Sequence, residues 1–276
     1  MSEPDDDQVR AIERDQWIGS QRQRAHDLVA REEPLEVRIA GIPIAVVMRT
    51  PGHDLELARG FALTERIVEH PRDILAVRHC DRVDDPEAED NVVQLIIDPA
   101  IDIDLPRLRR NVFTTSSCGV CGKASIAAAM GSAPPVEAAW TISIDVLRGL
   151  PDRLREGQPV FERTGGLHGA ALFDRAGSRL AVREDVGRHN AVDKLVGWVA
   201  EHGEWPPADC VLAVSGRVSF EIVQKAVAAR IPVLVAVSAP SSLAIDFAER
   251  SGVTLVAFVR GDRAGVYAGE WRVTKT

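Results

Sequence analysis

The chain has 276 residues, 45% of them hydrophobic, which is enough to bury one large core or two smaller ones. Its formal net charge of −8 and its aromatic content of 5% leave it without the basic surface and stacking side chains of a nucleic-acid-binding protein. No stretch approaches the ~20 consecutive apolar residues that cross a bilayer. The composition therefore predicts neither a nucleic-acid partner nor a membrane segment.

Cysteine usage indicates the compartment. Four cysteines are too few and too unevenly spaced for a secreted disulfide scaffold, and residues 1–23 contain no apolar segment of a signal peptide. We therefore expect a cytoplasmic protein, in which a Cys-x-x-Cys pair serves chemistry or metal binding more often than structure. Cys80 and Cys210 lie in or beside predicted strands, and each is expected to be a small core residue.

The N-terminal half predicts a small α+β lobe behind a leader. Residues 1–30 are charged and weakly patterned, which predicts a flexible leader with at most some helix. Residues 31–135 are assigned to the lobe, in which two β-rich runs around Ala40-Gly41 predict a hairpin. Asp54 is placed to cap a helix whose apolar residues recur at helical spacing.

The second half of this lobe leads to the cysteine pair. Strands are predicted over residues 74–83 and 91–98, separated by an acidic loop. The lobe ends in a polar, glycine-rich loop at residues 114–123, which carries Cys118 and Cys121.

Residues 136–276 predict a larger α/β domain. Its first elements are a helix capped by Ser143, a hairpin and an amphipathic helix over residues 187–200. Short apolar runs alternating with helices then predict a largely parallel sheet covered on both faces. These runs lie at residues 211–214, 233–237 and 253–259.

Ligands of such sheets collect beyond the carboxyl ends of the strands, where helix N-termini present unpaired N–H groups. The loops at these ends carry serine hydroxyls, glycines and arginines, which suit phosphate binding, although serine and glycine are also ordinary turn residues. Three such loops on one edge favour a phosphate-bearing ligand, although neither a Walker motif nor Gly-x-Gly-x-x-Gly occurs. The loops are Ser215-Gly216-Arg217, Ser238-Ala239-Pro240-Ser241 and Arg260-Gly261-Asp262-Arg263.

A fourth polar segment precedes the helix at residues 187–200. In it, Asp185 and Asn190 can be helix caps and His189 a packing residue, or all three can face a ligand, and the sequence leaves both interpretations open. His168 is equally ambiguous. Neither histidine has the spaced partner that a zinc site requires.

The Cys118–Cys121 pair can form a disulfide, share a metal or pass a sulfur atom between its thiols. Structural zinc needs four ligands, and no second Cys-x-x-Cys is present. A thioredoxin-like pair stands at a helix start after a strand, whereas a Thr-Thr-Ser-Ser run precedes this one. Nucleophilic chemistry by a thiolate is the interpretation that is left, and it is favoured if Arg109, Arg110 and Lys123 lie close in space.

Six ordered motifs together resemble the formate dehydrogenase accessory sulfurtransferase family, FdhD. The resemblance extends from Leu35 to the C-terminus, and so many motifs in one order are highly specific. The motifs are Ser117-Cys118-Gly119-Val120-Cys121-Gly122-Lys123, Gly165-Gly166-Leu167-His168-Gly169-Ala170-Ala171, residues 183–194, residues 215–221, residues 237–241 and residues 258–263.

The resemblance implies a homodimeric sulfurtransferase that takes persulfide sulfur from a cysteine desulfurase. It would pass the sulfur to the bis(molybdopterin guanine dinucleotide) molybdenum cofactor, which formate dehydrogenase then receives. Cys118 would be the persulfide-bearing nucleophile and Cys121 its relay partner. The family's cofactor-binding segment corresponds to Phe258, Val259, Arg260, Gly261, Asp262 and Arg263, and the strand-end argument adds Arg188, Ser215, Arg217 and Ser238.

The family also implies a cytidine-deaminase-like fold for residues 136–276, with a mixed sheet and flanking helices. Zinc deaminases carry His-x-Glu and Pro-Cys-x-x-Cys at two helix starts. Here the corresponding residues are Arg188-His189-Asn190-Ala191 and Ser215-Gly216-Arg217-Val218, so we expect no catalytic zinc and no other metal ligands. A non-catalytic molybdenum-cofactor chaperone and a zinc-dependent nucleoside deaminase are the alternatives.

Overall fold

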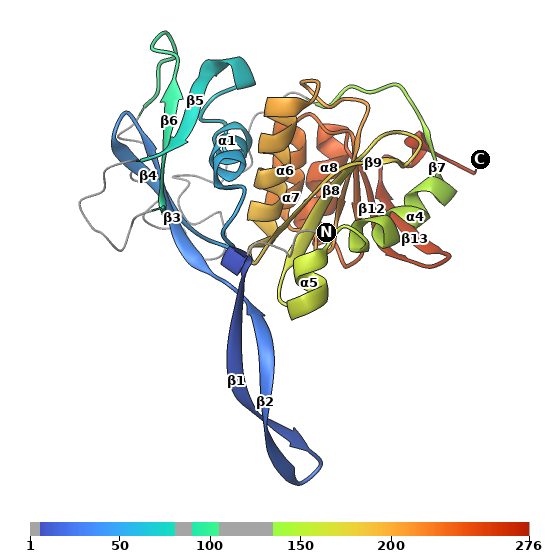
Figure 1. The fold of residues 1–276 in the computed structure, drawn as a ribbon. Helices are drawn as coiled ribbons and strands as arrows, with labels where there is room; N and C mark the ends of the chain where they lie inside the picture. The colour runs from blue at the N-terminus through green and yellow to red at the C-terminus, as the bar shows by residue number, and fades with distance from the viewer. Residues whose placement is uncertain (1–5, 81–89, 105–134, 276) are drawn as a thin grey trace.

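The computed structural model describes residues 6–80, 90–104 and 135–275, which fold around two larger β-sheets (Figure 1). The largest sheet has six strands in the order β13-β12-β11-β10-β8-β9. β10, β11 and β12 run parallel, whereas β8, β9 and β13 join through antiparallel pairs. The strands are β8 (His168–Phe173), β9 (Arg179–Asp185), β10 (Val211–Val214), β11 (Val233–Ala236), β12 (Thr254–Arg260) and β13 (Arg263–Ala268).

The mixed sheet agrees with the predicted fold class, but the largely parallel order holds only for the three central strands. Tight turns join β8 to β9 and β12 to β13, and a short turn can connect only antiparallel neighbours. The β13 strand was not expected from the sequence. The closer likeness to cytidine deaminases stays a prediction.

Helices cover both faces of this sheet, which explains its all-apolar central strands. Alternate residues of β10, β11 and β12 face two separate apolar clusters. One face packs against α6 (Arg188–His202), α7 (Phe220–Ala228) and α8 (Ser242–Ser251), and the other packs against α4 (Ile144–Arg155). α5 (Pro159–Thr164) follows α4.

The smaller sheet has the order β4-β3-β6-β5 and carries one helix. The hairpin predicted around Ala40-Gly41 is confirmed, because both residues have the positive φ angles of a tight turn between β3 and β4. The elements are β3 (Glu33–Ile39), β4 (Ile42–Arg49), α1 (Asp54–Thr64), β5 (Ile74–His79) and β6 (Val92–Ile97).

The predicted cap at Asp54 is wrong. His53 occupies the N-cap position of α1 with φ 59°, and Asp54 is the first helical residue. Its carboxylate accepts two hydrogen bonds from the buried Arg49 guanidinium, at 2.9 and 2.8 Å. Asp54 therefore neutralises a buried arginine, a role that local sequence does not show.

Residues 9–30 form strands in place of the expected leader with some helix. β1 (Val9–Ile18) and β2 (Gln21–Ala30) pair as an antiparallel hairpin that extends away from the rest of the molecule (Figure 1). Cross-strand ion pairs such as Arg24–Glu13 and Arg14–Asp27 lie along it. Its base packs against α5 through Val9. These strands could not be predicted from the sequence, because charged residues occupy both of their faces and leave no alternating apolar pattern.

The two sheets are joined through a close contact between α1 and α6. A Cβ atom at Gly60 would lie 1.8 Å from the Asp193 carbonyl oxygen, and one at Gly197 would lie 1.9 Å from the Glu56 carbonyl oxygen. Only glycine allows the two backbones to approach so closely. One apolar cluster consequently runs through both sheets and the helices between them.

Short elements complete the described residues. β7 (Ile142–Ser143) pairs in parallel with β14 (Val273–Thr274). 3-10 turns lie at Asp6–Gln8, Pro71–Asp73 and Glu270–Arg272. Within the described ranges, no helix is long and apolar enough to cross a membrane.

Candidate functional site

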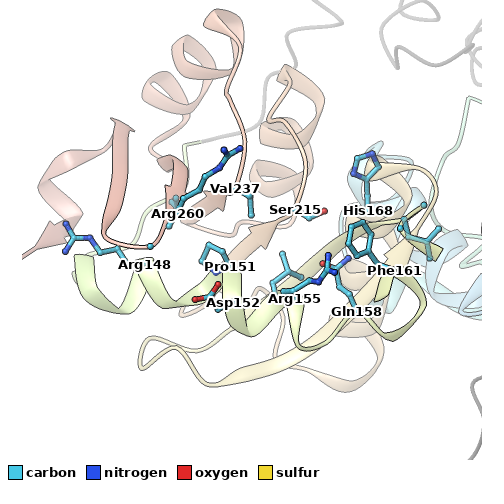
Figure 2. Close-up of a pocket in the computed structure, with 16 residues that line it drawn as sticks. Arg148, Pro151, Asp152, Arg155, Gln158, Phe161, His168, Ser215, Val237 and Arg260 are labelled. Carbon is cyan, nitrogen blue, oxygen red and sulfur yellow. The ribbon is translucent and has the colours of Figure 1, made fainter. Parts of the chain in front are cut away.

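A cavity of about 600 Å³ lies between α4 and the carboxyl ends of the central strands (Figure 2). The strand ends contribute Ser215, Val237 and Val259-Arg260-Gly261. This volume is in the range of small-molecule and cofactor sites. The opposite wall comes from α4, α5 and the start of β8, with Arg148, Pro151, Asp152, Leu154, Arg155, Gln158, Phe161, Gly165, Gly166, Leu167 and His168.

Parallel strand order explains why the three loops meet. Ser215 follows β10, Val237 follows β11 and Arg260 ends β12, so their loops emerge at the same edge of the sheet. The strand-end argument located this edge correctly. It could not identify the opposite wall, because the amphipathic pattern of α4 shows that the helix is half-buried but not what it faces.

The predicted cofactor-binding residues divide into two groups. Ser215, Val259, Arg260 and Gly261 line the cavity. The others lie at the same edge but do not line it, and they comprise Arg188 at the start of α6, Arg217 after β10, Ser238 after β11, Phe258 in β12, Asp262 in the β12–β13 turn and Arg263 at the start of β13.

Phe258 has an unusual backbone. Its φ angle is 53°, where β12 departs from regular pairing with β13, and its N–H donates to the Ser238 carbonyl oxygen at 3.3 Å. Its ring is half-exposed, 6.4 Å from the Tyr267 ring. A positive φ is costly for an aromatic residue and is typical of functional segments.

The floor of the cavity is a reciprocal pair of hydrogen bonds. The Gly169 N–H donates to Ser215 Oγ at 2.9 Å, and the Ser215 N–H donates to the Gly169 carbonyl oxygen at 3.0 Å. The Ser215 oxygen is thus already an acceptor. Its hydroxyl proton is left to donate to a ligand.

Positive charge gathers beside this floor. The His168 ring packs against the backbone of Gly216, and a Cβ at Gly216 would lie 3.9 Å from Arg188 Cβ. Burial, and then the charges of Arg188 and Arg217, lower the pKa of His168. The Arg188 Nε is buried and has no hydrogen-bond partner among the described residues. An anion would supply one.

Several side chains of the 183–194 motif connect elements of the fold. Asp185 is fully buried, and its carboxylate accepts hydrogen bonds from the N–H groups of Thr50 and Gly187 at 3.1 and 2.8 Å. It also accepts from Asn190 at 2.9 Å and forms an ion pair with Lys194 at 2.7 Å. Asp185 and Asn190 therefore fasten the β4–α1 turn to α6, and neither is the N-cap of this helix, which is Gly187.

Neighbouring residues of the motif have similar roles. Arg183 donates to the Glu56 carboxylate with one bond at 2.7 Å. Burial opposes ionisation of Glu56, but hydrogen bonds from Arg183 and His53 outweigh it and lower its pKa to about 2. Glu184 accepts from the first N–H groups of α5, at 3.0 and 2.8 Å. These side chains connect elements far apart in the sequence.

A buried ion pair joins α1, α6 and α7. Lys225 Nζ lies 2.9 Å from the Asp193 carboxylate and 3.0 Å from Thr64 Oγ1. Burial lowers the pKa of Lys225, but the Asp193 and Glu65 carboxylates outweigh burial and raise it.

His189 faces the neighbouring helix start. Its Nε2 lies 3.4 Å from Ser219 Oγ and 4.0 Å from the Glu221 carboxylate. In residues 6–80, 90–104 and 135–275, no three His, Cys, Asp or Glu side chains form a group that could hold a metal ion.

The predicted catalytic pair, Cys118 and Cys121, lies outside the described residues, as does the whole loop at 114–123. Cys210 is half-buried against the main core, and burial raises the pKa of its thiol to about 11. A thiol with so high a pKa is a poor nucleophile at neutral pH. Cys80 is also half-buried, directly after β5.

A solved structure has this fold. The crystal structure of a formate dehydrogenase accessory protein from Desulfotalea psychrophila matches with a TM-score of 0.74, covering 96% of this chain and 99% of that chain. The two sequences are 21% identical, so the likeness is one of fold.

Sequence comparison identifies the family. The model of the FdhD/NarQ family matches residues 30–274. The protein named sulfur carrier protein FdhD from Mycobacterium tuberculosis is 51% identical over 90% of this chain and 92% of the relative, and that from Streptomyces coelicolor is 51% identical over 90% of this chain and 89% of the relative. The chain belongs to the FdhD/NarQ family.

Proposed function

We propose that this protein is a sulfurtransferase that accepts persulfide sulfur from a cysteine desulfurase and delivers it to the bis(molybdopterin guanine dinucleotide) molybdenum cofactor. Formate dehydrogenase would be the recipient of the sulfurated cofactor. The names of the relatives support the sulfur-carrying part, and the description of the Desulfotalea protein supports the connection with formate dehydrogenase.

Cys118 is the proposed nucleophile. Its thiolate would attack the outer sulfur of the desulfurase persulfide, so that a new S–S bond forms at Cys118 and the desulfurase cysteine leaves as a thiolate. Cys121, three residues on, would be the relay partner. The two other cysteines do not suit this role, because Cys210 has a raised thiol pKa and both are half-buried.

The cavity is the observation that carries the cofactor-binding part. A guanine dinucleotide needs a concave site for its base and cations for its phosphates. The cavity supplies the concave site, and Arg148, Arg155 and Arg260 in its lining supply some of the cations. Arg188 and Arg217 extend the positive charge along the same edge, next to His168. Residues 258–263 and Ser238 would bind the cofactor at the rim.

The test of sulfur transfer is intact-mass analysis after incubation with a cysteine desulfurase and cysteine. The wild-type protein is expected to gain the mass of one sulfur atom, which a reductant removes, and Cys118→Ala is expected to gain none. A Cys118→Ala protein that loads as wild type would contradict the assignment. Binding of GDP without any sulfur gain in the wild type would instead indicate a non-catalytic cofactor chaperone.

A cytoplasmic homodimer is part of the proposal. A ligand with two guanine nucleotides suits a two-fold assembly in which each copy binds one. Light scattering of the purified protein should give twice the mass of the chain. A monomer mass at micromolar concentration would contradict the dimer.

A further inference from the structure

The tip of the β1–β2 arm exposes two large apolar side chains. Trp17 is 64% exposed and Ile18 is 59% exposed, and Trp17 is the most exposed large apolar side chain among the described residues. Because successive residues of a strand point to opposite faces, the tip is apolar on both faces of the ribbon. A tip of this kind suits insertion between two walls better than contact with a flat surface.

The arm has no core of its own. A two-stranded hairpin is at best marginally stable in water when nothing packs against it. Its base is held by Val9, which packs with Val160 and Leu167. From there, strands of ten residues extend for about 30 Å, and most of their side chains are exposed. A contact at the tip would fix the arm at both ends.

An apolar groove of about 290 Å³ lies where β3 and β6 end. Five isoleucines line it together with Leu95 and Pro99, and the polar side chains in its lining are Gln94 and Asp98. The Gln94 amide is occupied, since it accepts from the Gly41 N–H and donates to the Leu95 carbonyl oxygen. Because cofactor sites begin at about this size and carry polar groups for orientation, the groove suits an apolar side chain better than a nucleotide.

The charges around the tip and the groove are complementary. Residues 90–104, which supply most of the groove lining, contain four aspartates and neither lysine nor arginine. On the arm, Arg22 lies opposite Trp17 in the hairpin register. Arg22 forms an ion pair with Asp15 that is exposed to solvent, and such pairs contribute little to stability. An aspartate at the rim of the groove can therefore replace Asp15 as the partner of Arg22.

The arm of one chain does not approach the groove of the same chain. In Figure 1 the arm extends downwards from the start of β3, whereas β6 ends at the top of the small sheet. A second copy related by a two-fold axis can receive the first arm in its groove and place its own arm in the first groove. Two identical contacts then form in one closed dimer.

We propose that the β1–β2 arm is a dimerisation arm, whose tip at Trp17-Ile18 inserts into the β3–β6 groove of a second copy of this chain. The inference rests on the homodimer of the proposed function and assigns the surfaces that form it. Trp17 and Ile18 contact opposite walls of the groove. Arg22 lies towards the aspartates at its rim.

The dissociation constant of the dimer tests this contact, measured by sedimentation of the purified chain over a dilution series. Trp17→Ala should raise the constant roughly thirtyfold, because a buried tryptophan is a typical interface hot spot. Ile101→Lys should raise it to a similar extent, since it places a charge in the groove that also repels Arg22. Trp271→Ala is the matched control. It removes a similarly exposed tryptophan directly before β14 and should leave the constant unchanged.

Mixing the two variants tests whether the tip and the groove meet. Trp17→Ala keeps an intact groove and Ile101→Lys keeps an intact tip, so a mixed dimer has one complete contact, whereas each variant alone has none. The mixture should therefore contain more dimer than either variant does at the same total concentration. That result would also show that neither variant had lost its dimer by unfolding.

Two outcomes would overturn the inference alone. If Trp17→Ala dimerises as the wild type does, or if the mixture contains no more dimer than its components, the tip does not enter the groove although the homodimer stands. A wild type that is a monomer would instead remove the inference together with the homodimer of the proposed function. Sulfur loading of Cys118, measured separately by mass, is not decided by any of these results.

Discussion

His189 makes the stability of this protein depend on pH. Burial, and then the positive charges of Lys225 and Arg188, lower its pKa from 6.5 to about 4. Above pH 6.5 this histidine is neutral in both the folded and the unfolded state. As the pH falls from about 6.5 towards 4, the unfolded state takes up a proton more readily than the folded state, so the folded state loses stability. Between pH 7 and pH 5 we expect His189 to account for a loss of about 2 kcal/mol in the free energy of unfolding.

Urea unfolding at the two pH values measures this loss. His189→Asn should lose less stability than the wild type on acidification, by about the same 2 kcal/mol. His26→Asn, at an exposed position on the hairpin arm, is the matched control and should behave as the wild type. An equal pH dependence in His189→Asn and the wild type would show that His189 is not neutral in the folded protein.

Gln158 gives a second prediction for a single residue, this time for stability without ligand. Its amide nitrogen is buried beside the Glu184 carboxylate and forms no hydrogen bond of normal geometry among the described residues, so an apolar side chain of similar size would remove a poorly satisfied donor. Gln158→Leu should therefore be as stable as the wild type, or more stable by about 1 kcal/mol, in urea unfolding without nucleotide. If Gln158→Leu instead lowers the free energy of unfolding by more than about 2 kcal/mol, the amide has a structural hydrogen-bond partner.

Residue types in the 183–194 motif were recognised from the sequence, but their partners were not. Asp185 was an open choice between a cap and a ligand-facing group. The structure shows that it binds the Thr50 N–H, 135 residues earlier in the chain. Contacts of that separation leave no periodic signal, so only the fold distinguishes a structural carboxylate from a functional one.

At the scale of elements, the contact between α1 and α6 should tolerate no added atoms. Gly197→Ala would place a methyl group 1.9 Å from a backbone oxygen, which neither helix can avoid without moving. We expect a loss of about 3 kcal/mol in the free energy of unfolding, measured by chemical denaturation.

Gly149→Ala is the control for this substitution. Gly149 lies inside α4, and its nearest neighbour would be 4.0 Å from an added Cβ. Alanine there should leave stability unchanged or raise it by about 0.5–1 kcal/mol, because it restricts the unfolded chain. Equal effects of the two substitutions would contradict the close α1–α6 contact.

Elements with a clear apolar pattern were predicted well, and polar ones were not. The central strands of the large sheet and the Ser143 cap, whose Oγ accepts the Asp145 N–H at 3.2 Å, follow from local chemistry. The β1–β2 arm was not predicted from the sequence, because two-stranded ribbons can be charged on both faces. The prediction that Asp54 caps α1 was wrong, because its carboxylate accepts hydrogen bonds from the buried Arg49.

At the scale of the whole molecule, the sequence predicted one edge of the site and not its enclosure. Ser215, Arg260 and Gly261 follow apolar strands, so the strand-end rule located them. α4 and α5 form the other wall because they pack across the opposite face of the sheet, which depends on the complete topology. Gln158 could not have been singled out, since nothing local separates a buried glutamine from an exposed one.

The central claim is that one molecule carries sulfur on Cys118 and binds the cofactor at the strand ends. The direct measurement is activation of cofactor-free formate dehydrogenase by sulfur-loaded protein and the guanine dinucleotide cofactor. Arg260→Gln should load sulfur as the wild type does but activate at least tenfold more slowly, given the strength of arginine–phosphate bonds. Arg24→Gln, on the exposed arm, should load and activate normally. Full activation by Arg260→Gln, or by Cys118→Ala, would contradict the account.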